Sequence, residues 1–273
     1  MSYDVRERSL ADGQPIRLYE FKRGVLRWLY NSSDRDITHN SQIFRTVRGG
    51  MVDDGIRQSG EAEVDTLVIT APGLLEVAQF YRGVPPSAEI DLVVWDMHAG
   101  ETQVLVSWMG TIKGVKWPQL DRCDIAARTF EASLDDMGLA ETWTRSCTHT
   151  IYSLACGVDR NGFKVEVAIQ SMTGLSLSSG PLASFANGWF AGGFIEWPIG
   201  SGEFERRAIE THVGSVLQLL GGTAGLVNGQ TVFAFPGCDG LIPTCKDKFA
   251  NHLQYGGVPR LAGDSPFDGN PRY

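Results

Sequence analysis

Alternating hydrophobic and polar residues mark much of the first half of the chain and predict β-strands. Residues 16–21 alternate, residues 22–24 carry the turn sequence Lys-Arg-Gly, and residues 25–30 continue as a second strand, which together predict a hairpin. Apolar residues recur at helical spacing over residues 74–81 and predict a short helix. Further strands are expected at residues 65–70, 90–96, 102–115 and 123–134. This half of the chain therefore predicts a small antiparallel barrel or sandwich.

The second half of the chain predicts more strands. They are expected at residues 163–171, 175–177, 188–196, 204–220 and 230–235. The segment 206–220 is long enough for a helix, but its β-branched residues favour one or two strands. A short helix is expected over residues 245–255, with Phe249 and Leu253 on its inner side. Three prolines predict an extended tail over residues 257–273.

The pattern breaks near residues 135–141, where two aspartates and a glycine indicate a domain boundary. We therefore expect an N-terminal β-rich domain over residues 1–140 and a C-terminal β domain over residues 141–273. The predicted fold class is mainly β, with antiparallel barrel or sandwich domains and a few short helices.

Composition narrows the possible partners. The 273 residues carry a formal net charge of −8 and no basic run, which argues against nucleic-acid recognition. No apolar run reaches the length of a transmembrane segment, and the polar N-terminus predicts no secretory signal. We expect folding in a reducing cytoplasm, where five cysteines are metal ligands or buried thiols more often than a disulfide framework.

Four of the cysteines form two pairs. Eight residues separate Cys147 from Cys156, and six separate Cys238 from Cys245. A pair on a short loop can offer two thiolates to one metal centre, and iron–sulfur clusters need four thiolates. Spacing alone leaves open a zinc site with four cysteines, four buried thiols, or a disulfide formed in air. Cys123 lies in a predicted strand and is expected to be a buried thiol.

Other chemistry receives less support. None of the five histidines has zinc-protease spacing, although His149 follows Cys147 by two residues and could bind metal or donate to a sulfur. An ordinary polar loop role for His149 is the more frequent case. Asp53 and Asp135 each begin a pair of aspartates, which belong to solvated turns more often than to cation sites. Serine-hydrolase and nucleotide-binding motifs are absent from the sequence.

Two segments resemble a known family. Residues 237–251 read GCDGLIPTCKDKFAN and are followed by GGVP at residues 256–259, while residues 145–159 read RSCTHTIYSLACGVD. Both resemble a family of conserved phage proteins and gene-transfer-agent hub proteins. A more distant resemblance is to the tail-tip protein L of lambdoid phages, in which four cysteines with the same pair spacings hold a [4Fe–4S] cluster.

The resemblance implies that Cys147, Cys156, Cys238 and Cys245 hold a [4Fe–4S] cluster, with zinc as the alternative. A β module is inserted between the two pairs, and Lys248 and Asn251 are expected to brace the helix of the second pair. The N-terminal domain is then a hub domain, and the C-terminal domain carries the cluster as a structural staple.

The same resemblance implies a non-enzymatic structural protein of the virion, at the tail tip or baseplate, assembled in the host cytoplasm. Such hubs form homotrimers and connect the distal tail ring to the central fibre or receptor-binding protein, near the tape-measure protein, and take part in genome ejection. The alternative is a metal- or cysteine-dependent tail-associated enzyme, either a cell-wall hydrolase or a redox protein. A hydrolase would need an exposed Cys147 thiolate paired with His149.

Overall fold

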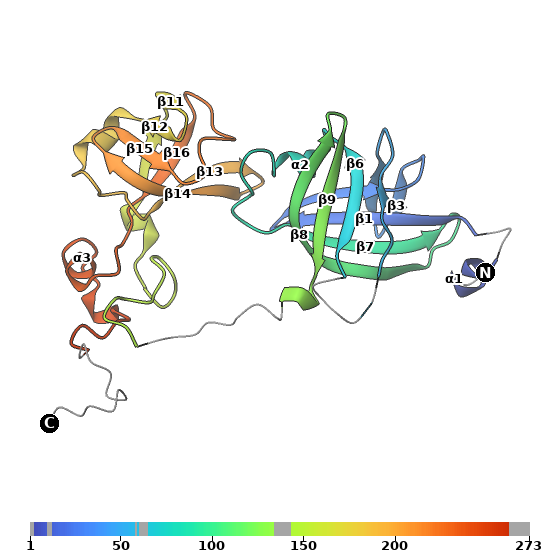
Figure 1. The fold of residues 1–273 in the computed structure, drawn as a ribbon, viewed down its shortest axis with the longest axis horizontal. Helices are drawn as coiled ribbons and strands as arrows, with labels where there is room; N and C mark the ends of the chain where they lie inside the picture. The colour runs from blue at the N-terminus through green and yellow to red at the C-terminus, as the bar shows by residue number, and fades with distance from the viewer. Residues whose placement is uncertain (1–2, 10–12, 58, 60–64, 134–142, 262–273) are drawn as a thin grey trace. The chain divides into compact units, whose positions relative to one another are not determined.

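A computed structural model describes residues 3–9, 13–57, 59, 65–133 and 143–261 (Figure 1). The chain divides into two compact units, one of residues 1–137 with 198–205 and the other of residues 138–197 with 206–273. The domain boundary predicted at residue 140 lies outside the described residues. Residues 198–205, which we expected in the C-terminal domain, belong to the first unit.

A nine-stranded sheet forms the first unit, and it curls on itself (Figure 1). The strand order is β3-β4-β2-β1-β7-β8-β9-β6-β5. Neighbours pair antiparallel except β2 and β4, which are parallel. Its strands are β1 Pro15–Arg23, β2 Leu26–Asn31, β3 Ile37–His39, β4 Gln42–Thr46, β5 Val52–Asp53, β6 Leu67–Pro72, β7 Asp91–His98, β8 Val104–Gln119 and β9 Arg122–Thr129; its helices are α1 Tyr3–Glu7, α2 Glu76–Gln79 and the 3₁₀ turn η1 Glu131–Ser133.

Period-two patterning explains this sheet. Alternate residues of β6 and β9 are buried, because successive strand side chains point to opposite faces. The buried face packs into one core, which includes Phe21, Leu92 and Ile125. The predicted hairpin is confirmed: Phe21 of β1 pairs with Trp28 of β2. Gly110 is required on β8, because a Cβ there would lie 1.9 Å from the Arg128 carbonyl oxygen.

A buried ion pair holds residues 198–205 in the first unit. Arg23 Nη1 lies 2.7 Å from Glu205 Oε2, and the side chains of Arg23 and Glu205 are 1% and 9% exposed. The Ser87 N–H donates to Glu205 Oε1 at 2.7 Å. Since buried charges are tolerated only when paired, this contact fixes where the segment docks.

The second unit contains most of a seven-stranded sheet of order β10-β16-β13-β14-β15-β12-β11. The segment 204–220 forms two strands, as its β-branched residues predict. The strand predicted at residues 188–196 begins only at Phe194, because Gly188 and Gly192 adopt positive φ angles. The strands are β10 Val165–Ala168, β11 Ser171–Thr173, β12 Ser176–Ser178, β13 Phe194–Gly200, β14 Glu203–Val213, β15 Val216–Leu219 and β16 Thr231–Phe235.

Three short 3₁₀ turns and one helix complete this unit: η2 Arg160–Phe163, η3 Gly180–Ser184, α3 Ile242–Asp247 and η4 His252–Gln254. The helix predicted over residues 245–255 is wrong in its bounds. Proline in the first turn of α3 allows an earlier start, and Ala250 at φ 51° ends the helical run. Phe249 is buried as predicted, but Leu253 is 87% exposed.

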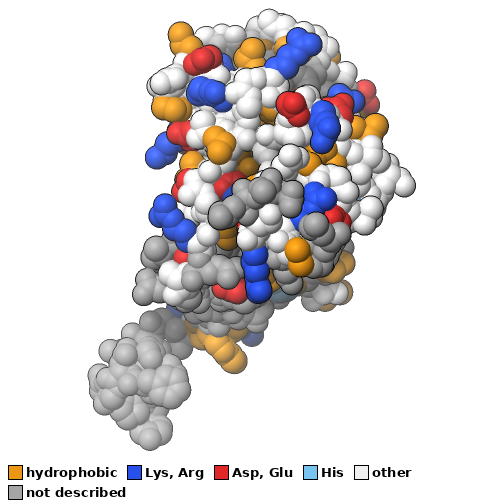
Figure 2. Space-filling model, turned by 90° about the vertical axis from the view of Figure 1, so that its right-hand side faces the viewer, with side chains coloured by type: hydrophobic (Ala, Val, Ile, Leu, Met, Phe, Trp, Pro, Cys, Tyr) orange, Lys and Arg blue, Asp and Glu red, His pale blue; other side chains and the backbone are white. Residues whose placement is uncertain are grey.

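The mainly β fold with few short helices is confirmed. In the described part, no helix is both long and apolar enough to span a membrane. On the face drawn in Figure 2, basic side chains are interspersed with acidic ones, so neither sign of charge gathers there.

Candidate functional site

The four paired cysteines lie in the second unit, on two segments that contact each other. The Cys147 N–H donates to the Gly240 carbonyl oxygen at 2.8 Å, which joins the loop of the first pair to the loop of the second. Burial raises the pKa of the Cys245 thiol, and the nearby Cys238, Cys147 and Cys156 raise it further. The fold therefore gathers all four predicted ligand residues into one neighbourhood. Cys156 and Cys245 are buried, and Cys147 and Cys238 are partly exposed.

Local hydrogen bonds shape the loop of the first pair. Tyr152 adopts a positive φ of 64°, which turns the chain between the two cysteines. The Tyr152 hydroxyl donates to the Pro236 carbonyl oxygen at 2.8 Å, two residues before Cys238. The Cys156 N–H donates to Ser153 Oγ at 3.2 Å. These bonds fix Cys156 and tie its loop to the approach of the second pair.

The loop of the second pair depends on an aspartate and a glycine. Asp239 accepts hydrogen bonds from the Leu241 N–H at 2.9 Å and from the Thr244 hydroxyl at 2.8 Å, so its carboxylate holds the start of α3. Gly237 has no room for a side chain, since a Cβ there would lie 2.0 Å from the Ala191 carbonyl oxygen. The backbone just before Cys238 therefore packs closely against the backbone of residues 191–193.

The stretch after α3 returns to the first pair. The Gly256 N–H donates to Cys147 Sγ at 3.3 Å. A Cβ on Gly256 would lie 2.5 Å from the His149 ring, so a larger residue there would have to displace the imidazole. The Tyr255 hydroxyl bridges the two loops through the carbonyl oxygens of Arg145 at 2.7 Å and Gly240 at 2.9 Å.

The side chains of Asn251 and Lys248 bond to the segments that carry the cysteines and not to helix α3, which we expected them to brace. The Asn251 side-chain amide donates to the Cys156 carbonyl oxygen at 2.6 Å, with Cys156 Sγ at 3.9 Å. The Lys248 ammonium donates to the carbonyl oxygens of Trp189 at 2.5 Å and Gly237 at 2.7 Å. Both side chains therefore bond to the backbone at or next to a cysteine: Asn251 at Cys156, and Lys248 at the residue before Cys238.

An apolar base lies under the site. Cys156, Val158 and Phe249 are buried together, and Tyr152 and Cys238 pack against them. Such surroundings limit solvent access and lower the local dielectric constant, which strengthens charge interactions at the sulfurs.

The donor set suits a sulfur-liganded metal centre. Soft thiolates select zinc and iron–sulfur clusters, and N–H groups aimed at the sulfurs, as at Cys147, are typical of their surroundings. Within the described residues, no three His, Cys, Asp or Glu side chains converge closely enough to hold one metal ion. His149 keeps a buried Nδ1 without a hydrogen-bond partner. The described residues show no hydrogen bond between His149 and Cys147, whose sulfur instead accepts from Gly256.

The other candidates have structural roles. Asp53 accepts from the Tyr19 hydroxyl at 2.6 Å and pairs with Arg17, so it is no open cation site. The pair beginning at Asp135 lies outside the described residues. Cys123 is a buried thiol on β9, as predicted, and it donates to the Pro72 carbonyl oxygen at 3.4 Å.

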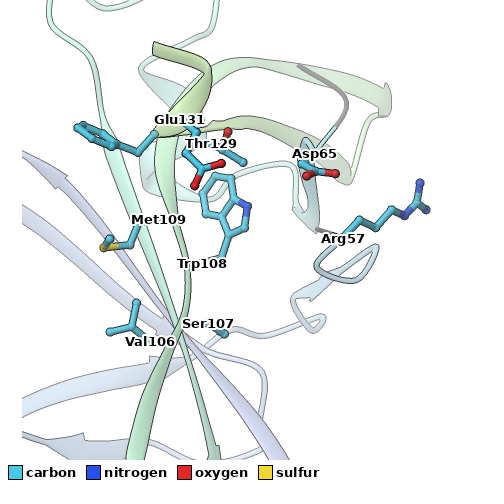
Figure 3. Close-up of a pocket in the computed structure, with 9 residues that line it drawn as sticks. Arg57, Asp65, Val106, Ser107, Trp108, Met109, Thr129 and Glu131 are labelled. Carbon is cyan, nitrogen blue, oxygen red and sulfur yellow. The ribbon is translucent and has the colours of Figure 1, made fainter. Parts of the chain in front are cut away.

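A surface hollow of about 580 Å³ lies in the first unit (Figure 3). The Trp108 indole stands at its centre, with Thr129 and Glu131 on one side and Asp65 on another (Figure 3). Asp65 accepts from the N–H and hydroxyl of Ser59 at 2.7–3.0 Å. Asp65 is thus engaged by Ser59, and Trp108 offers the hollow an aromatic surface for contact.

Three contributors to the cysteine site were not predicted from the sequence: the N–H of Gly256 and the hydroxyls of Tyr152 and Tyr255. Gly256 lies in the GGVP stretch, Tyr255 directly precedes it, and Tyr152 lies in the segment 145–159 that also carries the resemblance. Nothing in the local sequence shows that the GGVP stretch returns to Cys147.

Two protein families match the chain. Residues 188–265 match one described as phage conserved hypothetical protein BR0599. Residues 22–159 match one described as baseplate hub protein, N-terminal attachment domain. A protein of Xylella fastidiosa (strain 9a5c), described as uncharacterized, is 32% identical over 124 residues, which are 41% of this chain and 25% of the relative. The chain therefore spans about a quarter of the length of that relative.

Among solved structures, a chain from the virion of a native gene transfer agent particle has the same fold. It superposes with a TM-score of 0.79 at 19% sequence identity, over 99% of this chain and 96% of that chain. These findings confirm the resemblance carried by the cysteine segments and the C-terminal stretch. Since the hub match covers about half of the 273 residues, the protein belongs to the baseplate hub family, as a structural protein of the virion tail.

Proposed function

We propose that the protein is the hub of a tail tip, where it joins the distal tail ring to the central fibre or receptor-binding protein. The match of residues 22–159 to an attachment domain carries this proposal. The similarity of nearly the whole chain to a gene-transfer-agent virion protein supports it. The hub works as a homotrimer around the tail axis, close to the tape-measure protein, and its role is non-enzymatic.

Particles made without this protein test the hub proposal. Deleting its gene should leave tails that lack the tip and the central fibre, as seen by electron microscopy, and a plasmid copy should restore both. Native mass spectrometry of the purified chain should give a trimer. Complete, infectious tails in the deletion strain would refute the proposal.

The second part of the proposal concerns the cysteines. Cys147, Cys156, Cys238 and Cys245 hold a [4Fe–4S] cluster as a structural staple, with zinc as the alternative. Their shared neighbourhood and the N–H donor at Cys147 support a four-thiolate site. The four irons of a cluster each take one thiolate, so the sulfurs stand farther apart than ligands of one ion. Iron and zinc analysis of the purified protein separates the two.

In this site the chain itself does the binding and positioning. The four thiolates would hold the group, with the Gly256 N–H orienting Cys147 and the Asn251 amide orienting Cys156. The bound group supplies cross-links between the two loops, and its binding energy becomes folding energy of this unit.

Anaerobic purification followed by absorption spectroscopy and iron and sulfide analysis tests the staple. A brown protein with about four irons per chain is expected. C238S should lose the metal and lower the melting temperature, whereas C123A, which removes a buried thiol from the other unit, should keep the full metal content. A colourless protein with about one zinc per chain would replace the cluster. A C238S variant that keeps both metal and melting temperature would remove the staple from the proposal.

A further inference from the structure

Lys248 is a cation held in place by neutral groups. Its ammonium donates to two backbone carbonyl oxygens, those of Trp189 and Gly237. It also lies 4.7 Å from the Trp189 ring centroid, and aromatic rings attract cations. In the part of the chain that the structure describes, no carboxylate lies at ion-pair distance from Lys248. The carbonyl and ring dipoles therefore fix this charge without cancelling it.

The Lys248 ammonium lies beside the chain segment that carries Cys238. Gly237, whose carbonyl oxygen Lys248 binds, directly precedes Cys238. Burial lowers the pKa of Lys248, and the charges of Cys238 and Asp239 oppose that effect. Asp239 is already engaged by two donors at the start of α3. Cys238 accepts a hydrogen bond from the Gly240 backbone, and the Lys248 ammonium adds a positive charge near it.

The net charge of a metal-loaded site explains why a cation is needed here. Four thiolates carry more negative charge than one zinc ion or a four-iron core supplies in positive charge, so a loaded site keeps a net negative charge. A buried net charge is costly unless an opposite charge lies near it. The Lys248 ammonium is the cation that the fold supplies beside the second cysteine pair.

We propose that Lys248 is a positioning residue of the four-cysteine centre, an inference that rests on the proposed function. Its ammonium offsets the negative charge that remains on the thiolates after metal binding. Its hydrogen bond to Gly237 fixes the backbone that presents Cys238. The same positive charge favours the more negative, reduced state of a bound cluster.

Two substitutions separate the charge from the hydrogen bonds. K248M removes the charge and both donors but keeps the apolar stem, and K248Q removes the charge but keeps an amide donor on a shorter side chain. Lys246, an exposed lysine on α3, supplies the control K246M. Cobalt(II) alone, titrated anaerobically into the full chain, reports thiolate binding through its sulfur-to-metal absorption. We expect roughly 10–100-fold weaker cobalt binding in K248M and K248Q, as for other outer-shell partners, and no change in K246M.

The reduction potential of the reconstituted cluster is the second readout. It should fall in K248M and K248Q and stay unchanged in K246M, a shift that a merely structural lysine would not cause. If K248M does not fold, K248Q alone decides. Wild-type affinity and potential in K248Q would overturn the inference. A wild-type chain that binds neither cobalt nor a reconstituted cluster would instead overturn the proposed four-cysteine centre.

Discussion

Substituting Glu205 by glutamine should lower the stability of the first unit more than a comparable substitution on the surface does. Glutamine keeps the size and polarity of the side chain and removes only its charge. The Arg23 guanidinium, 1% exposed, would then stay buried without a carboxylate partner. The change also acts on the arm of residues 198–205, which docks on the first unit through this pair.

The size of the loss follows from what Arg23 keeps. Its remaining hydrogen bonds are long, 3.3 Å to Ser87 Oγ and 3.4 Å to the Phe204 carbonyl oxygen. Breaking a buried pair by removing one partner costs roughly 3–5 kcal/mol. Since Arg23 Nη1 makes no well-directed hydrogen bond to Glu205, we expect the lower end, about 3 kcal/mol. In a protein of this size that corresponds to a melting temperature lower by about 6–12 °C.

Thermal unfolding of the full chain, followed by circular dichroism, measures this effect. The matched control is E89Q, because Glu89 pairs with Arg128 at 3.1 Å while its side chain is 67% exposed. That variant should lose less than about 1 kcal/mol. The double variant R23M/E205L should recover most of the loss, since apolar residues can replace a buried pair. Equal melting temperatures for E205Q and E89Q would refute the reasoning.

Three further predictions concern acid stability and the site. Burial opposes ionisation of Asp53, but hydrogen bonds from its tyrosine and arginine partners hold its pKa below the usual value, so the ionised carboxylate stabilises the fold at neutral pH and this stability is lost as pH falls through the lowered pKa. In denaturant titrations D53N should therefore be less stable than wild type at pH 7, and the difference should narrow below about pH 4. A difference that stays constant with pH would contradict this. G256A should drive a Cβ into the neighbouring imidazole and weaken anaerobic cobalt binding, whereas G162A, with open space around its Cα, should bind normally; equal binding by both would count against the N–H donor. Y255F removes a hydroxyl that bridges both cysteine loops, and should cost about 1 kcal/mol in chemical denaturation, which an unchanged midpoint would exclude.

The local sequence pattern was enough to predict the longer strands, but it did not predict the shortest strands or the bounds of helix α3. Alternation or a short apolar run beside turn residues located β1, β2, β6, β7, β8 and β9, because one face of each strand packs on a core. The short strands β3, β4, β5 and β11 have too few residues to show a period. The bounds of α3 depended on a positive φ at Ala250, a conformation that alanine adopts only when the surrounding contacts impose it.

The candidate site, too, could be predicted from the sequence only in part. The cysteine pairs are visible as spacing, so their residues could be named from sequence. The groups that orient them could not, because each contact joins distant positions: Gly256 reaches Cys147, and Tyr152 reaches the residue before Gly237. The docking of residues 198–205 was invisible for the same reason, since Arg23 and Glu205 are 182 positions apart.

The positions of the cysteines along the chain show how the proposed staple would stabilise the second unit. Cys156 precedes β10, the first strand of the second sheet, and Cys238 follows β16, its last strand. The 81 residues between Cys156 and Cys238 contain every strand of that sheet. A cross-link that closes a loop of this length removes unfolded-state entropy worth about 4–5 kcal/mol, by the relation used for disulfides. A sheet built from short strands with non-local pairing gains most from such closure, because pairing its ends is the costly step. The cluster would therefore stabilise this unit by joining the entry and exit of its sheet, and the polar residues after Cys245 would keep the two loops in register for that bond.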